Sequence, residues 1–158
     1  MALTRAAVVT ELAARLAVPL TDAGIATTDD PGNLKEPLDD TFRLAGYDEG
    51  DLTSPTIADT DTLAILTLAV YVTLGAIRDR LLDRFDLSTD GDSFKLSQSL
   101  ANVERRITAA EADVIARWGS MPSGAESGVI MLDLGQLTAG GVVVGHDFPY
   151  TIVGMGDG

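Results

Sequence analysis

A run of sixteen uncharged residues, 62–77, places the tightest constraint on what this chain can fold into. Its apolar residues recur every three or four positions and predict a helix over residues 60–84. The first four turns are apolar nearly all round, so this helix must be covered on several sides. The run is shorter than the ~18–20 residues of a membrane-spanning helix, and we therefore interpret it as the core helix of a bundle and expect no membrane partner. The expected stripe consists of Leu63, Leu66, Val70, Leu74, Ile77 and Leu81, widened by Ile65, Leu68 and Val72.

Three further helices are expected around this core. Apolar spacing predicts a first helix over 4–17, which Pro19 should end, and a short second helix over 33–46, which Gly46 should close. A fourth helix is expected over 96–118, with Gly119 after its last turn. Loops are expected over 18–32 and 47–60, and a hairpin or tight turn over 85–95. The fourth helix should bury a near-heptad stripe of Leu96, Leu100, Val103, Ile107, Ala110, Val114 and Trp118.

The composition changes after residue 118. Ten of the sixteen glycines lie there, and the short apolar runs 129–134, 142–144 and 150–153 have strand character. We expect a helical-bundle domain over 1–118 and an extended, β-like arm over 119–158. The fold class is therefore mainly α, a small antiparallel bundle of about four helices with a short hairpin and that arm. The apolar residues of the arm would be poorly covered in a monomer, which predicts a partner surface for Val142, Val143, Phe148 and Tyr150.

The charge is strongly negative. Eleven Lys and Arg residues stand against 24 Asp and Glu residues, a net charge of −13, which argues against direct binding to nucleic-acid phosphates. Only two of the bases are lysines, and 18 of the acids are aspartates. This balance fits a salt-adapted protein, and a GC-rich genome explains it equally well.

Little in the sequence indicates catalysis. The chain has no cysteine and one histidine, His146, which excludes thiolate chemistry and two-histidine metal sites. The segment 86–91 begins like a calcium loop, but its twelfth position is Ser97 and not the required Glu, so we interpret it as a turn. The acidic pairs are interpreted as solvated surface and not as acid–base dyads. We expect no enzyme activity, cofactor or metal. The acidic pairs are Asp29-Asp30, Asp39-Asp40 and Asp48-Glu49.

The segment 85–98 resembles a recurring stretch in the head–tail connector (adaptor) proteins of tailed bacteriophages and tailed archaeal viruses. In that family a long helix ends in a hydrophobic-Asp-hydrophobic-Ser turn. A short strand with a glycine, a serine and a basic residue follows, and Ser-Gln opens the next helix. The resemblance covers roughly residues 4–118, including the order of the earlier helices. The matching positions are Leu87, Ser88, Gly91, Ser93, Lys95, Ser97 and Gln98.

The resemblance implies a non-enzymatic virion protein of the neck, assembled in the host cytoplasm. Such proteins form a homo-oligomeric ring, usually twelve-fold, beneath the portal ring. The ring extends the DNA channel without binding DNA specifically, and it docks the stopper or the tail-completion protein. An acidic channel wall would repel DNA and let it pass.

The residues themselves indicate candidate contacts of such a ring. Arginines on the two long helices are candidates for pairing with aspartates of a neighbouring subunit, and Trp118 lies either at an interface or at the edge of the core. Two alternatives stay open: an acidic helical interaction module of cellular origin, and another neck or tail-completion ring protein, although those are mostly β-rich. The candidate arginines are Arg78, Arg80, Arg84, Arg105 and Arg106.

Overall fold

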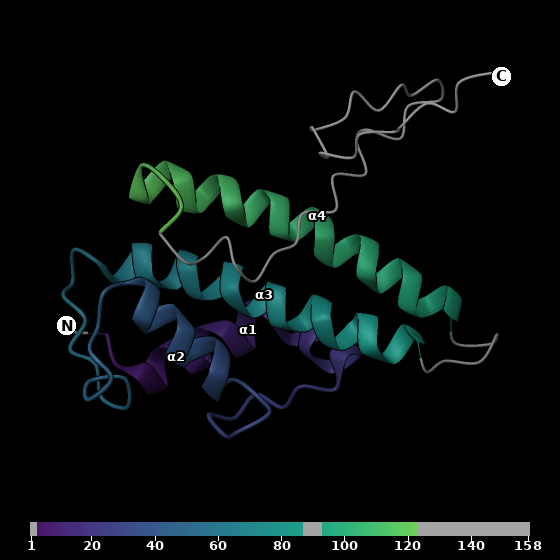
Figure 1. The fold of residues 1–158 in the computed structure, drawn as a ribbon, viewed down its shortest axis with the longest axis horizontal. Helices are drawn as coiled ribbons and strands as arrows, with labels where there is room; N and C mark the ends of the chain where they lie inside the picture. The colour runs from purple at the N-terminus through teal and green to yellow at the C-terminus, as the bar shows by residue number, and fades with distance from the viewer. Residues whose placement is uncertain (1–2, 87–92, 123–158) are drawn as a thin grey trace, which may run out of the picture.

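The computed structural model, which describes residues 3–86 and 93–122, is a bundle of four helices, one of them central. In chain order they are α1 (Arg5–Ala23), α2 (Lys35–Leu44), α3 (Thr62–Asp86) and α4 (Ser93–Trp118). The long helices α3 and α4 run antiparallel along each other, and α1 and α2 cover the other side of α3 (Figure 1). The chain is mainly α, as expected.

The central helix α3 confirms the prediction from the uncharged run. Ile65, Leu68, Leu74 and Ile77 are each at most 2% exposed, and they face helices on different sides. Thr62–Phe85 is long and apolar enough to cross a membrane by length and composition, with a mean hydropathy of 1.5. Burial of this helix inside the bundle explains the same composition. One member of the predicted stripe is wrong: Leu63 is 47% exposed, because it lies in the first turn of α3, beyond the cover of the neighbouring helices.

The short helix α2 closes one side of the core. Leu34, Leu38 and Phe42 are fully buried, and Ala45 packs at the edge of the same cluster. Their spacing of three and four residues predicts one helix face, and the structure confirms it. Gly46 follows with a φ of 89°, a left-handed conformation that glycine adopts without steric cost. The predicted end of this helix is therefore confirmed as well.

The prediction that Pro19 ends the first helix is wrong. The helix α1 continues through Pro19 to Ala23. At Leu16 the backbone leaves the helical conformation, with a φ of −116° and a ψ of 17°. Proline has no N–H, so the carbonyl of Arg15, four residues earlier, loses its partner within the helix. The Nη2 atom of Arg106 in α4 donates to that carbonyl at 2.9 Å. A tertiary contact thus satisfies the group that the proline leaves open.

The expected hairpin over 85–95 is also corrected. Helix α3 extends to Asp86 and helix α4 already begins at Ser93, so only residues 87–92 separate them, and these lie outside the described residues. Residues 93–99 contain no β-branched side chain that would favour a strand. Within residues 3–86 and 93–122 the β structure is limited to an isolated bridge between Leu3 and Ile57. The expected arm lies outside the described residues from 123 onward.

One buried polar group in α3 carries a stability prediction. The side-chain hydroxyl of Thr73 is buried and, among the described residues, has no hydrogen-bond partner. Thr73→Val removes this unpaired group at nearly constant shape, so we expect it to stabilise the fold by about 1 kcal/mol in urea denaturation. The control is Thr67→Val, because the Thr67 hydroxyl donates to the Leu63 carbonyl at 2.8 Å. That variant should gain nothing, and equal effects of the two substitutions would contradict the prediction.

Candidate functional site

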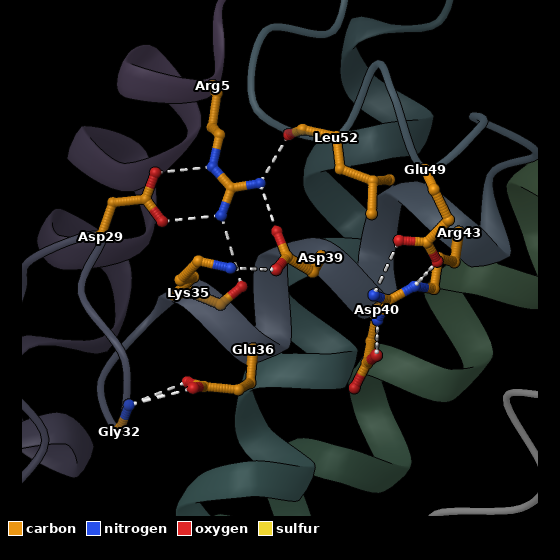
Figure 2. Close-up of polar contacts among 10 residues, drawn as sticks. All are labelled: Arg5, Asp29, Gly32, Lys35, Glu36, Asp39, Asp40, Arg43, Glu49 and Leu52. Carbon is orange, nitrogen blue, oxygen red and sulfur yellow. Dashed lines mark hydrogen bonds and ion pairs between the residues drawn. The ribbon is translucent and has the colours of Figure 1, made fainter.

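The guanidinium of Arg5 connects four separate segments of the chain (Figure 2). Its side chain is only 7% exposed. Its Nε and Nη2 atoms donate to the two carboxylate oxygens of Asp29, both at 2.6 Å. Its Nη1 atom donates to Asp39 Oδ1 and to the Leu52 carbonyl, both at 2.6 Å, and Nη2 also reaches the Lys35 carbonyl at 3.3 Å. All five N–H groups of the guanidinium therefore have an acceptor.

Asp39 and an aromatic pair complete this cluster. The second oxygen of Asp39 accepts a hydrogen bond from Lys35 Nζ at 2.7 Å. The Arg5 guanidinium lies 5.7 Å from the centre of the Phe42 ring, and Tyr47 meets the same ring edge-on at 5.6 Å. Two cations thus balance the two carboxylates at the boundary between the core and the loops. Arg5, Asp29, Lys35 and Asp39, with the Leu52 carbonyl, are called the Arg5 cluster below.

The electrostatics of the Arg5 cluster favour its charged state. Hydrogen bonds to Asp29 raise the pKa of Arg5, against the opposing effect of burial, and Asp39 raises it further. Burial by itself would raise the pKa of Asp39, but the hydrogen bonds and charges of Lys35 and Arg5 outweigh it and hold that pKa below its usual value. The cluster therefore acts as a structural clamp, since every polar group in it already has a partner.

The interpretation of the acidic pairs as solvated surface is only partly right. It is wrong for Asp39, which is 8% exposed. Asp29 is exposed as expected, although both of its carboxylate oxygens are paired with Arg5. The sequence contained a signal for this, because Arg5 lies at helical spacing before Val8 on the buried face of α1. A charge on an apolar face needs buried partners. The remaining members are exposed as expected: Asp30, Asp40, Asp48 and Glu49.

Three of the five candidate interface arginines donate to backbone carbonyls of this chain itself. Each one ties a long helix to another segment: one carbonyl lies beside the kink of α1, one in the last turn of α1 and one in the turn before α2. The three contacts join Arg80 Nη2 to the Gly32 carbonyl at 3.1 Å, Arg84 Nη1 to the Asp22 carbonyl, and Arg106 Nη2 to the Arg15 carbonyl. Sequence patterns did not indicate these contacts, because every residue has a backbone carbonyl and no residue type marks the one that will accept.

The other two candidate arginines differ in their surroundings. Arg78 has a side chain only 12% exposed and pairs with the neighbouring Asp79 at 2.8 Å. Arg105 is exposed, and its Nη1 atom lies 3.4 Å from Asn102 Oδ1. Pairing of these arginines with a neighbouring subunit stays a prediction.

Trp118 lies at the edge of the core, one of the two positions expected for it. Its indole N–H donates to the Ala64 carbonyl at 3.2 Å, which ties the end of α4 to the start of α3. The ring lines a cavity of about 470 Å³ together with Tyr47, Asp61 and Arg117. This cavity combines one acidic and one basic side chain, so it has no net charge.

A second cavity lies between α1 and α4, beside the proline kink. Its volume is about 300 Å³. Val18 and Pro19 of α1 form an apolar wall, and Val18 is 70% exposed. The α4 side carries Arg105 and Arg106. Asp22, Ser99, Asn102 and Val103 complete the lining, and the Ser99 hydroxyl donates to the Asp22 carboxylate at 2.9 Å. We call this the α1–α4 cleft; no pattern in the sequence indicated it.

The connector-like motif departs from its expected geometry. Ser93 and Lys95 were expected on a short strand, but both belong to the first turn of α4, and Ser97-Gln98 follow in the second turn instead of opening the helix. The Ser97 hydroxyl donates to the Phe94 carbonyl at 2.7 Å, a contact within that helix. Some predicted positions lie outside the described residues: Leu87, Ser88, Gly91, Val142, Val143, His146, Phe148 and Tyr150.

No group of three or more acidic or histidine side chains that could hold a metal ion occurs within residues 3–86 and 93–122. Comparisons with protein-family models, with curated proteins and with solved structures find no match for this chain.

The Arg5 cluster leads to a prediction on stability. Arg5→Leu leaves the buried Asp39 carboxylate with Lys35 as its remaining cation and removes the partner of Asp29, so we expect a loss of about 3–5 kcal/mol in the free energy of unfolding, measured by urea denaturation. Arg43→Leu is the matched control, because Arg43 pairs with Asp40 and Glu49 at an exposed site. It should cost much less. Similar losses in the two variants would contradict a special role for Arg5.

The lowered pKa of Asp39 predicts a pH dependence. A carboxyl group whose pKa falls on folding adds stability above its unfolded pKa of about 3.9, and that stability is lost as the pH drops through the lower folded value. Wild type should therefore be more stable than Asp39→Asn at pH 7. This difference in the free energy of unfolding should become smaller as the pH falls below about 4. Asp48→Asn removes one charge at an exposed position and should follow wild type. A gap that stays constant down to acid pH would refute the prediction.

Proposed function

We propose that this chain is a subunit of a head–tail connector ring of a tailed virus, an adaptor that joins the portal to the stopper or tail. It acts as a structural protein of the virion neck. Its expected partners are further copies of itself in a ring of about twelve subunits, the portal and the next neck protein. DNA passes through the ring without specific binding.

The order and lengths of the helices carry this proposal. An N-terminal helix of 19 residues and a short helix of 10 residues precede two long helices of 25 and 26 residues. This is the order that the resemblance implies. The segment 87–92 between the long helices carries the Ser and Gly positions of the family motif. The start of α4 at Ser93 departs from the family pattern, and it leaves the helix order intact.

The contacts within the chain suit a ring subunit. A subunit that joins one ring to the next in a defined orientation must be rigid. The contacts of Arg80, Arg84 and Arg106 fix the long helices to α1 and to the loop before α2. The bundle can therefore serve as one rigid block, with its lateral surfaces available for neighbours.

The outer surface of α4 supplies charges for such neighbours. Acidic and basic side chains both lie along its exposed and half-buried positions, and among the described residues none of those named below forms an ion pair. Charged side chains of both signs on a surface contribute more to the choice of partner and to the register of an interface than to its affinity. The side chains concerned are Lys95, Glu104, Arg105, Glu111, Asp113 and Arg117.

The exposed apolar residues cluster in part where the two long helices meet. Phe94 is 68% exposed at the start of α4, and Leu82 is 41% exposed near the end of α3. Aromatic residues such as phenylalanine are enriched in protein interfaces, and exposed apolar side chains that lie together mark interaction sites. They support a protein-binding role over a catalytic one.

The four helices favour the adaptor over a stopper or tail terminator, since those neck proteins are mostly β-rich. A cellular interaction module of acidic character is the other candidate. It would use the same exposed surfaces, and the experiment below separates it from a virion component.

The test is quantitative mass spectrometry of purified virus particles from the source of this sequence. We expect this chain in the particle at about one copy for each portal subunit, because stacked rings of equal symmetry contain equal numbers of subunits. The portal and the major capsid protein serve as internal standards. Absence from particles, with presence in infected or uninfected cells, would refute the proposal in favour of the cellular module. Solution mass alone is insufficient, because adaptors can remain monomeric until they meet the portal.

A further inference from the structure

The α1–α4 cleft is the more basic of the two cavities described above. Arg105 and Arg106 face a single acid, Asp22, whose carboxylate already accepts a hydrogen bond from Ser99. Arg106 uses one N–H group for the Arg15 carbonyl, and within residues 3–86 and 93–122 Arg105 makes only the long contact with Asn102. A cleft with spare guanidinium donors on a chain of net charge −13 is suited to an acidic occupant.

The cleft also needs an apolar group from its occupant. Val18 forms its rim and is 70% exposed, the highest exposure among the large hydrophobic residues that the structure describes. The volume of the cleft, about 300 Å³, corresponds to about ten water molecules, which is enough for one or two side chains. The matching occupant is therefore a peptide with a carboxylate next to an apolar residue.

Residues 123–158 of the same chain have this chemistry. They contain four acidic residues and no lysine or arginine, and two of the acids stand next to large apolar residues, in Leu132-Asp133-Leu134 and in Asp147-Phe148. We propose that this segment docks in the α1–α4 cleft of its own chain, with a carboxylate on Arg105 and an adjoining apolar side chain over Val18. The proposal is independent of the virion role proposed above.

The length of the chain permits docking within one molecule. Asn102 lies sixteen residues before the end of α4 at Trp118, about 24 Å along the helix. Asp133 follows Pro122 by eleven residues, which span up to about 36 Å when extended. A tethered segment within reach has an effective concentration in the millimolar range, so at micromolar protein it should fill the cleft of its own chain before that of another.

The absence of cysteine makes a disulfide test possible in the full-length chain. Val18→Cys is combined in turn with Ser127→Cys, Gln136→Cys, Thr138→Cys and Thr151→Cys, and each pair is oxidised at micromolar concentration. Because a disulfide requires Cα atoms about 4.4–6.8 Å apart, only a segment seated at the cleft gives efficient cross-linking. We expect at least one pair to form an intramolecular disulfide in high yield, identified by peptide mass and by monomeric mobility.

Matched controls decide the outcome. Thr108→Cys replaces Val18→Cys in a parallel series, because Thr108 is exposed on α4, lies outside the cleft lining and is nearer to the end of that helix. This series should cross-link at least fivefold less. Arg105→Glu should lower the yield of the Val18 series several-fold, and Asn102→Cys offers a second cleft position if Val18→Cys impairs folding. Equal yields in the Thr108 and cleft series would overturn the proposal. Disulfides only between molecules would overturn it in favour of a second copy as the occupant.

Discussion

The buried guanidinium of Arg5 is the interaction on which the arrangement of the short elements depends. A charge at this position, 7% exposed, is tolerable only because five acceptors surround it. Those acceptors come from the loop after α1, from α2 and from the loop before α3. The loops bury Ile25, Leu52 and Ile57 in the core, and the cation ties these loops to one another and to α2. Phe42 beneath the cation connects the ion pairs to the core.

Arginine side chains of the two long helices also bind acceptors in distant segments of the chain. The proline in α1 removes one donor from the helix, and Arg106 replaces that donor from across the bundle. Arg80 and Arg84 bind carbonyls near the turn that follows α1. Arginine suits this role because its planar group offers several donors on a long stem. These arginine side chains therefore stabilise the fold of the chain itself. Any contact with a neighbouring subunit has to use their remaining donors or the unpaired charges of α4.

The features of the described residues that remain open to a partner lie on the surface. The polar groups of the Arg5 cluster are satisfied, whereas the charges of both signs on α4, the exposed Phe94 and Leu82, and the α1–α4 cleft are accessible. Both proposals rest on these features. The adaptor proposal and the docking of residues 123–158 address different parts of that surface. The first concerns what the bundle contacts in an assembly, and the second concerns what its own chain covers beforehand.

The sequence by itself determined the class of the fold and most of its core. The uncharged run of α3, the stripe of α4, and Gly46 and Gly119 at the helix ends predicted these elements to within a few residues, because helical periodicity and the glycine conformation are local properties. Tertiary structure alone decided the passage of α1 through Pro19, the burial of Asp39, the intramolecular contacts of the arginines and the α1–α4 cleft. Each depends on a partner far away in the chain, such as the Arg15 carbonyl for Arg106, and a backbone acceptor has no signature in the sequence. The position of Arg5 on an apolar stripe showed that partners were needed, and only the packed fold showed which ones they are.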